Sequence, residues 1–468
     1  MPRVAAARAE DLLDTFGVVT HLAYTDGGYR DLNATMDALA YLGIDYVRDG
    51  APNPNYDRYG QEHYAQAAAL GVHFTFAADG GVDPFVEVAR IHAIEATHPG
   101  TVTAIEGPNE VNNWQVAYQG LTGTAGAQAY MKALYDAVQA DPLVKDIDVS
   151  GFTDWPFHAS VSDTSSIHPY AKEGDQPLAT IQQNMAGQSA VDPNKAFYIT
   201  ETGYHTQINP SGGWEGVDEA TQAKLLLNTY MDGARLGAKE TYVYQLLDAY
   251  SGSSQEEHFG LMRLDNSPKP AATAIHNLTT ILADHGDKNL SFTPQSLSYT
   301  VKGNDQAYTY LTQKSDGSFQ LIVWSEPDIW NQDTNQPIAV AATKTAITFG
   351  TAAKSIQVFD PLTGTAAVQA LNHASSVTLN VTDHPLVVQF QPEQNHHLRG
   401  TAGADMQAGR AVSDTIQLHH SAVSSGDRAH SLMSHSGDDV TPKIGLETTE
   451  FSNFFLHGLK AADFDLFS

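Results

Sequence analysis

A regular alternation of short apolar runs with longer amphipathic stretches, between about residues 16 and 284, is the feature that most constrains the fold. The apolar runs have the length of buried strands, whereas stretches such as 32–42 and 219–231 repeat apolar residues at helical spacing. The eight candidate strands are Phe16–Leu22, Ile44–Arg48, Val72–Ala77, Val102–Glu106, Asp148–Phe152, Ser165–His168, Ala196–Thr200 and Thr241–Gln245. This alternation predicts a (β/α)₈ barrel. An open doubly wound sheet is the alternative, but no Gly-x-Gly-x-x-Gly sequence opens a first helix to bind a dinucleotide.

The pattern changes after the barrel. Between residues 287 and 392, short alternating β-type runs are separated by turn residues, which predicts a small antiparallel β-sandwich. Residues 393–468 are rich in His, Ser, Gly and Ala and show little periodicity. The sequence therefore predicts an α/β fold with a TIM barrel over residues 1–286, a β-sandwich over 287–392, and a poorly structured, flexible C-terminal extension over 393–468.

Charge excludes several kinds of partner. The chain has 468 residues, with 54 Asp plus Glu against 25 Lys plus Arg, and a formal net charge of -29 at pH 7. Nucleic acid and anionic membrane surfaces are poor partners for such a chain, because both are bound through Lys and Arg. The surplus of acids also disfavours a strongly anionic polysaccharide, unless basic residues gather at the binding cleft.

Metal and redox chemistry lack their usual residue patterns. Cysteine is absent, which excludes disulfides, thiolate metal sites and cysteine nucleophiles. The barrel region has no His-x-His and no His-Glu-x-x-His, so we expect no metal and no cofactor.

Signals for location are weak. No apolar run is long enough to span a bilayer, and the N-terminal residues do not form a cleavable signal peptide. Residues 398–409 resemble one unit of a Gly- and Asp-rich calcium-binding repeat, although a single unit cannot build a calcium β-roll. With the terminal residues 463–468, this fits bacterial-type export through an uncleaved C-terminal signal. We therefore expect an extracellular protein; a cytoplasmic location and calcium binding near Asp405 stay open.

Two glutamates stand at the ends of candidate strands. Glu110 follows the fourth strand in Ile-Glu-Gly-Pro-Asn-Glu, and Glu201 ends the seventh in Tyr-Ile-Thr-Glu-Thr-Gly-Tyr. In a barrel both side chains would meet at the mouth formed by the loops after the strands. A pair of carboxyl groups there suits glycoside hydrolysis, because one can protonate the leaving oxygen while the other attacks the anomeric carbon. A lone Glu at a strand end would only indicate a solvated surface.

Asn109-Glu110 after the fourth strand and Thr200-Glu201 at the end of the seventh resemble the signature of clan A retaining glycoside hydrolases. His258-Phe-Gly-Leu, Asp265 and Lys269-Pro-Ala resemble the same clan's eighth loop and helix. The combination of a barrel and a β-sandwich looks most like glycoside hydrolase family 39 and its relatives. This resemblance implies a retaining β-glycosidase acting on an oligo- or polysaccharide, with Glu110 as acid/base and Glu201 as nucleophile.

The resemblance also implies roles for residues around this pair. Asn109 would bind the sugar 2-hydroxyl, and Arg48 would keep the nucleophile ionised through its positive charge. The other candidate substrate-binding residues are His21, His168, Tyr170, Tyr204, Trp114 and Trp155. Many clan members carry a Trp at the end of the eighth strand, but residues 242–248 contain none, so Tyr244 or Gln245 takes that position. Glu106, four residues before Glu110, is expected to point into the barrel as a structural acid.

The sequence leaves several alternatives open. A non-catalytic carbohydrate-binding barrel and a transglycosidase could carry the same residues. Sugar identity, linkage, endo or exo cleavage and oligomeric state are not determined.

Overall fold

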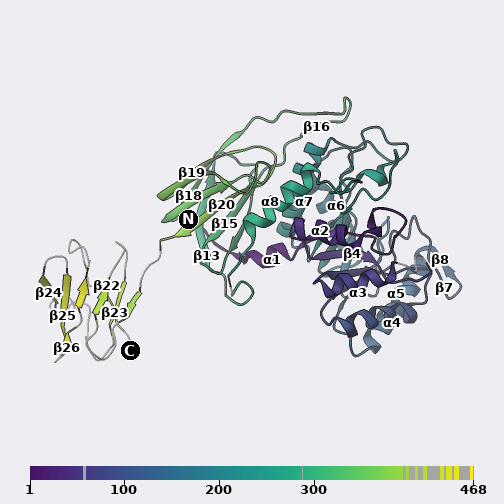
Figure 1. Cartoon of the computed structure of the whole chain (residues 1–468), viewed down its shortest axis with the longest axis horizontal. Coiled ribbons are helices and arrows are strands. Elements are labelled where there is room, and N and C mark those ends of the chain that lie inside the picture. The colour runs from purple at the N-terminus through teal and green to yellow at the C-terminus, as the bar shows by residue number, and fades with distance from the viewer. Residues whose placement is uncertain are drawn as a thin grey trace. The chain divides into compact units, whose positions relative to one another are not determined.

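The computed structural model describes residues 1–55, 60–286 and 288–393, together with the backbone of short strands further along the chain (Figure 1). Met1–Gln391 form one compact unit, and Pro392–Ser468 form another. The first unit contains a parallel barrel and a mostly antiparallel β-domain.

Eight parallel strands form the barrel, in the order β10-β11-β12-β3-β4-β5-β6-β9. A further parallel bridge between Ser150 and Thr164 connects the two ends of this path, so the barrel is nearly closed. The strands are β3 (Phe16–Val19), β4 (Tyr46–Gly50), β5 (His73–Ala77), β6 (Val102–Glu106), β9 (Asp148–Ser150), β10 (Ser165–Ile167), β11 (Phe197–Thr202) and β12 (Thr241–Val243). Each lies within or overlaps one of the eight predicted runs, so the predicted barrel is confirmed.

Helices cover the outside of the barrel: α2 (Leu32–Leu42), α3 (Gln61–Ala69), α4 (Pro84–Thr97), α5 (Gly123–Ala140), α6 (Pro177–Val191), α7 (Glu219–Leu236) and α8 (Pro270–Leu282). Their ends follow local chemistry. The Asp31 side chain accepts the Ala34 N–H at the start of α2, and Asp218 does the same for Thr221 at the start of α7. Helix α2 ends at Gly43, whose φ of 65° suits a residue without a Cβ.

One predicted helix is absent. The segment 151–164, which connects β9 to β10, is described throughout and contains no helix. It contains Pro156 and lacks a run of apolar residues at helical spacing, so it has no helical face to bury. The expectation of eight strand–helix alternations is therefore wrong at this position, where an extended loop places Trp155 at the barrel mouth.

The β-domain follows the barrel, as predicted. Its strands are β13 (Ser296–Lys302), β14 (Tyr308–Gln313), β15 (Phe319–Trp324), β18 (Thr343–Phe359), β19 (Ala367–Val381) and β20 (Leu386–Pro392), joined by β1 (Arg3–Ala5) and β2 (Ala7–Arg8). Strand β1 pairs with β13 and β2 pairs with β14, at opposite ends of the path β1-β13-β18-β20-β15-β14-β2. The segment 3–8 therefore pairs with both edges of this sheet. By this pairing it belongs to the β-domain, whereas the sequence placed it in the barrel region 1–286.

The remaining short elements are α1 (Ala9–Leu13), η1 (Gly28–Arg30), η2 (Gln255–His258) and the strand pairs β7 (Ala117–Tyr118) with β8 (Leu121–Thr122) and β16 (Trp330–Asn331) with β17 (Gln336–Pro337).

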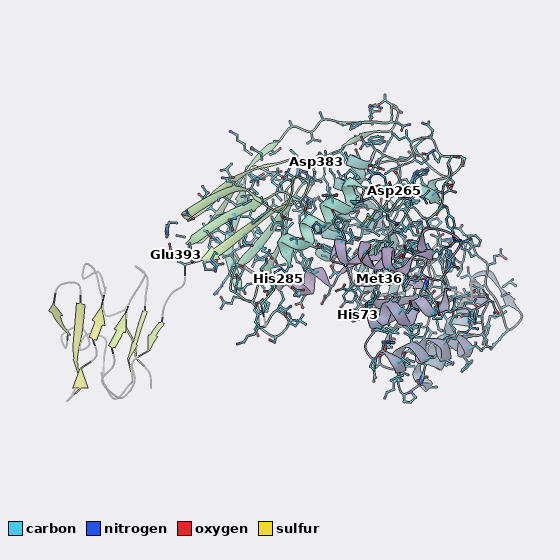
Figure 2. All side chains as sticks on the ribbon, viewed as in Figure 1. Met36, His73, Asp265, His285, Asp383 and Glu393 are labelled. Atoms are coloured by element: carbon cyan, nitrogen blue, oxygen red, sulfur yellow. The ribbon has the colours of Figure 1, made fainter. Side chains whose placement is uncertain are left out.

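Polar contacts join the barrel to the β-domain along α7 and α8. Lys224 on α7 forms an ion pair of 2.8 Å with Asp383, a residue labelled in Figure 2. Trp324 Nε1 donates to Asp232 Oδ1 at 3.2 Å, and Gln320 Nε2 donates to the Ile281 carbonyl at 2.8 Å. The two domains are therefore packed as one body.

Most of the predicted C-terminal extension, including Asp405, lies outside the described residues. Backbone strands there are β21 (His397–Arg399), β22 (Met406–Ala408), β23 (Thr415–Leu418), β24 (Met433–Ser436), β25 (Asp439–Ile444), β26 (Glu447–Thr448), β27 (Glu450–Ser452) and β28 (Phe464–Leu466). Whether the extension is flexible stays a prediction. Among the helices of the described part of the chain, none has the length and apolar character of a membrane span.

Candidate active site

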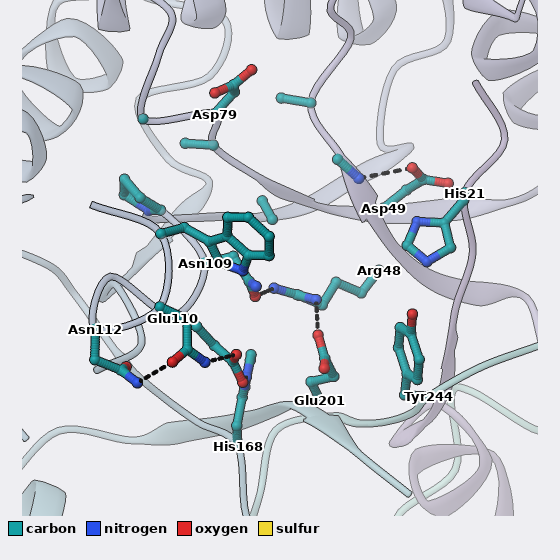
Figure 3. Close-up of a pocket in the computed structure, with 18 of the residues that line it drawn as sticks. His21, Arg48, Asp49, Asp79, Asn109, Glu110, Asn112, His168, Glu201 and Tyr244 are labelled. Atoms are coloured by element: carbon teal, nitrogen blue, oxygen red, sulfur yellow. Dashed lines mark hydrogen bonds and ion pairs between the residues drawn. The ribbon is translucent and has the colours of Figure 1, made fainter. Parts of the chain in front are cut away.

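The carboxyl ends of the barrel strands open into a large pocket with a volume of about 1340 Å³. The loops that follow the strands meet at this end of a barrel. Ten of the residues predicted from the sequence line the pocket: His21, Arg48, Asn109, Glu110, Trp114, Trp155, His168, Tyr170, Glu201 and Tyr244. Figure 3 shows the arrangement of most of them.

Glu201 is held by two donors at the end of β11. Arg48 Nη1 donates to its Oε2 at 2.8 Å, and the Tyr170 hydroxyl donates to its Oε1 at 2.6 Å. Burial, and then the charge of Glu201, raises the pKa of Tyr170 well above its usual value, so this hydroxyl keeps its proton. The Glu201 carboxyl group is thus fixed in position by a donor on each of its oxygens.

Arg48 connects the Glu201 carboxylate to β6 and to the loop that follows it. Its Nε donates to Glu106 Oε2 at 2.6 Å and its Nη2 donates to Asn109 Oδ1 at 2.7 Å. Burial opposes the charge of Arg48, but Glu106 and Glu201 outweigh this effect and raise its pKa. Glu106 has no exposed surface, in agreement with the expectation of a structural acid.

Glu110 has different partners from Glu201. His168 Nδ1 lies 3.0 Å from its Oε1, and Asn113 Nδ2 donates to its Oε2 at 2.8 Å. The hydrogen bond with His168 is the largest of the effects that lower the pKa of Glu110 to about 2. Its backbone has a φ of 38°, which is unusual for a residue with a Cβ, and its N–H donates to Thr153 Oγ1 at 2.8 Å. Unusual backbone conformations of this kind concentrate at functional sites.

The two glutamates lie close together. A carboxylate oxygen of Glu110, a ring nitrogen of His168 and a carboxylate oxygen of Glu201 lie within 4.8 Å of one another. Such a triad has the composition of a metal site, but the positive charge of Arg48, 2.8 Å from Glu201, opposes a cation there. The geometry instead brings together two carboxylates with separate hydrogen-bond partners.

The opposite end of the pocket is aromatic. The His21 ring stacks on Tyr24 with centroids 5.0 Å apart, and it meets Tyr244 edge-on at 5.9 Å. Burial, and then the charge of Arg48, lowers the pKa of His21 to about 4, so its imidazole is neutral at pH 7. Burial raises the pKa of the neighbouring Asp49 to about 7. These rings and polar atoms have the chemistry of a sugar-binding subsite.

Two predicted residues do not reach the pocket. Tyr204 is buried, and its hydroxyl donates to the Asp175 carbonyl at 2.8 Å. Gln245 is also buried: its Oε1 accepts from the Tyr29 hydroxyl at 3.1 Å. Both side chains point into the protein, so the structure does not bring them to the pocket as the sequence predicted. Of the two candidates for the missing tryptophan, Tyr244 is the one that lines the pocket.

Sequence reasoning also missed residues that line the pocket, including Asn113, Trp214 and Glu256. Asn113 lies in the turn that follows Glu110. Because the two residues are only three positions apart, the sequence alone could have suggested their hydrogen bond. Trp214 lies in the loop after β11 and packs edge-on against Tyr170, with centroids 5.8 Å apart. It carried the same signal as Trp114 and Trp155, an aromatic residue in a loop after a barrel strand. Glu256, from η2, offered no comparable pattern.

No protein-family model and no curated protein sequence matches the chain. Solved structures do. A family 39 glycoside hydrolase from Bacteroides cellulosilyticus superposes with a TM-score of 0.55 at 14% identity, covering 83% of each chain. A monomeric β-xylosidase from Caulobacter crescentus gives a TM-score of 0.54 at 14% identity, covering 83% of this chain and 98% of that one. A family 39 enzyme from Xanthomonas axonopodis gives 0.51 at 14% identity, with 83% and 96% covered. The predicted resemblance in fold to family 39 is confirmed.

Proposed function

We propose that the protein is a retaining β-glycosidase that hydrolyses O-glycosidic bonds of an oligo- or polysaccharide. Glu201 is the nucleophile and Glu110 the acid/base. The observation that carries the proposal is the close approach of these two carboxylates, delivered from β6 and β11 to one pocket and held by different partners. The glycoside hydrolases among the solved structures support it through their shared fold.

The separation of the carboxyl groups supports retention rather than inversion. In retaining enzymes the two groups lie about 5–5.5 Å apart, whereas inverting enzymes hold them about 6.5–9.5 Å apart to accommodate a water molecule between them. One oxygen of Glu110 and one oxygen of Glu201 lie within 4.8 Å of each other, which is compatible with the shorter class.

The reaction then proceeds in two displacements. A Glu201 oxygen attacks the anomeric carbon, the bond from that carbon to the glycosidic oxygen breaks, and Glu110 gives its proton to the departing oxygen. In the second step Glu110 takes a proton from water, whose oxygen attacks the anomeric carbon and releases Glu201. Asn109, whose Oδ1 accepts a hydrogen bond from Arg48 Nη2, binds the sugar 2-hydroxyl in both steps of the proposed reaction.

The low pKa of Glu110 makes this residue a carboxylate in the free protein, the form needed as the base of the second step. The first step needs it protonated. Substrate binding that removes water from Glu110 disfavours its charge and so favours the protonated form. His168 Nδ1, 3.0 Å from Glu110 Oε1, holds the carboxyl group in position.

Azide rescue tests the assignment of both roles. Glu201→Gly should abolish hydrolysis of aryl β-glycosides, and added azide should restore turnover by attacking the anomeric carbon from the vacated side, which gives an α-glycosyl azide. Glu110→Ala should instead accumulate the glycosyl-enzyme and give a β-glycosyl azide. Glu62→Ala, at an exposed position on α3, is the control and should keep full activity.

Activity of Glu201→Gly without azide, or the same azide anomer from both variants, would contradict these catalytic roles. A wild-type protein that binds oligosaccharides without cleaving any of them would favour the non-catalytic barrel. Transfer of the sugar to another carbohydrate instead of water would indicate a transglycosidase, which product analysis distinguishes.

A further inference from the structure

Two tryptophans at the pocket are unusually exposed. Trp114 and Trp155 have 70% and 59% of their surface exposed, whereas Trp324 and Trp330 are fully buried in the protein. Large exposed aromatic side chains contribute little to folding and mark binding surfaces. Both line the pocket that contains Glu110 and Glu201, so packing does not account for them.

Both tryptophans are attached to the loop that carries Glu110. The Trp114 N–H donates to the Glu110 carbonyl at 2.9 Å, so Trp114 closes the turn that begins at the acid/base. The Trp155 N–H donates to Asn112 Oδ1 at 3.1 Å. A side recess with a volume of about 90 Å³ is lined by Glu110, His168 and Trp155 together. The backbone of both tryptophans is thus tied to the loop that carries Glu110.

The tryptophans therefore lie on a defined side of the bond to be cut. Figure 3 shows Glu110 and Asn112 on one side of the Arg48–Glu201 pair, and His21 and Tyr244 on the other. The acid/base protonates the leaving oxygen, so the departing group lies on the side of Glu110, while the sugar attacked by Glu201 lies towards His21 and Tyr244. Trp114 and Trp155, which are bonded to the loop of Glu110 and line the pocket, belong to the side of the departing group.

We infer that Trp114 and Trp155 form the binding platform for a leaving group that is itself a sugar, so the substrate continues beyond the scissile bond on that side. This inference rests on the proposed function and adds to it the form of the substrate: an oligo- or polysaccharide chain bound on both sides of the cut, rather than a terminal sugar on a small aglycone. The pocket volume of about 1340 Å³ agrees, because pockets for one small ligand measure about 300–1,000 Å³. Pyranose rings present flat C–H faces that stack on indole rings.

A comparison of two substrates that differ only on the leaving side tests the inference. A β-glycosyl fluoride has no sugar on that side, whereas a β-linked oligosaccharide of the same sugar does. Glucosyl, galactosyl, xylosyl and mannosyl fluorides, with the matching oligosaccharides, are assayed with wild type, Trp114→Ala, Trp155→Ala and the double variant. We expect kcat/KM for the oligosaccharide to fall about tenfold or more in each single variant, while kcat/KM for the fluoride stays within about twofold.

Two further variants distinguish stacking from a general loss of structure. Trp155→Phe should recover most of the oligosaccharide activity, because it keeps an aromatic face. Phe85→Ala removes an aromatic side chain that is 56% exposed on α4 and does not line the pocket, so both substrates should be unaffected.

Equal losses on fluoride and oligosaccharide, or no loss on either, would overturn the platform while leaving the proposed function in place. A wild-type protein that cleaves neither substrate class would overturn the proposed function itself, and the platform with it.

Discussion

Arg48 connects the fold to the chemistry, and replacing it with Met gives a quantitative prediction. Its side chain is 6% exposed and bridges Glu106, which has no exposed side-chain surface, to Glu201, whose side chain is 13% exposed. Met fills the space of the aliphatic stem but removes the guanidinium. Two carboxylates are then left without their cation, one of them entirely inside the barrel.

The cost of this change follows from the buried charge. Removing one partner of a buried ion pair costs about 3–5 kcal/mol, because the remaining charge is unpaired. Among the contacts of Glu106, His168 Nε2 lies 3.9 Å from Oε1, too far to replace the 2.6 Å bond from Arg48 to Oε2. We therefore expect the free energy of unfolding of Arg48→Met to fall by about 3–5 kcal/mol at pH 7. Activity should fall by about 10²–10³-fold, since Glu201 and Asn109 both lose their anchor.

A double-mutant cycle isolates the charge. Urea unfolding is measured for wild type, Arg48→Met, Glu106→Gln and the double variant. The double variant should be destabilised by less than the sum of the single variants, because Gln at position 106 leaves no buried charge to compensate. Its activity should stay as low as that of Arg48→Met. Additive stability changes, or a loss below about 1 kcal/mol in Arg48→Met, would refute the reasoning about the buried pair.

Two further predictions concern stability. Burial, and then the neighbouring Glu326, raises the pKa of Asp232 well above its usual value, and burial also raises the pKa of Glu326. Carboxyl groups with raised pKa values bind protons more tightly in the folded state, so the pair should make wild type lose stability as the pH rises from about 4 through the folded pKa values. Glu326→Gln should flatten this slope and stabilise the protein at pH 8 by about 1.4 kcal/mol for each unit by which the pKa of Asp232 falls. An unchanged slope in urea unfolding measured from pH 4 to 8 would contradict this prediction. In Gly17→Ala the new Cβ would lie 2.4 Å from Cδ1 of the buried Tyr242, so we expect a loss of about 1–3 kcal/mol, whereas the control Gly212→Ala, with no atom within 4 Å of the new Cβ, should change thermal unfolding little.

The sequence predicted the barrel and the two glutamates at its mouth for a physical reason. Parallel strands that are covered by helices are rich in apolar residues, so most of the barrel strands were visible as short apolar runs between helical stretches. The position of Glu110 and Glu201 at strand ends then fixed which side of the barrel they face. The contacts that define their roles, from His168 and Arg48, join residues far apart in the chain and follow from the closure of the barrel.

The errors lie where periodicity gives no information. Beyond the last paired residue of a strand, side-chain direction depends on the path of the loop, and so Tyr204 and Gln245 point into the protein while Tyr244 faces the pocket. The segment 151–164 lacks a helix because it has no amphipathic face. The strands β1 and β2 were missed because so short a segment becomes a strand only through its pairing partners, such as Ser298 for Arg3 and Thr312 for Ala7, which come far later in the chain.

The distribution of charge in the pocket sharpens what the net charge of -29 left open. Basic residues do not gather there: the lining includes five acidic residues, Asp49, Asp79, Glu110, Glu201 and Glu256, against the basic residues Arg48 and Lys172. Arg48 forms ion pairs with Glu106 and Glu201. Lys172 Nζ lies 4.5 Å from the centre of the Trp214 ring. A polyuronate would bring further carboxylates into this partly desolvated space, where like charges repel most strongly. A neutral or cationic sugar chain meets no such repulsion, and the exposed rings of Trp114 and Trp155 offer it the apolar faces on which uncharged sugars stack. Charge and aromatic surface thus favour the same class of substrate.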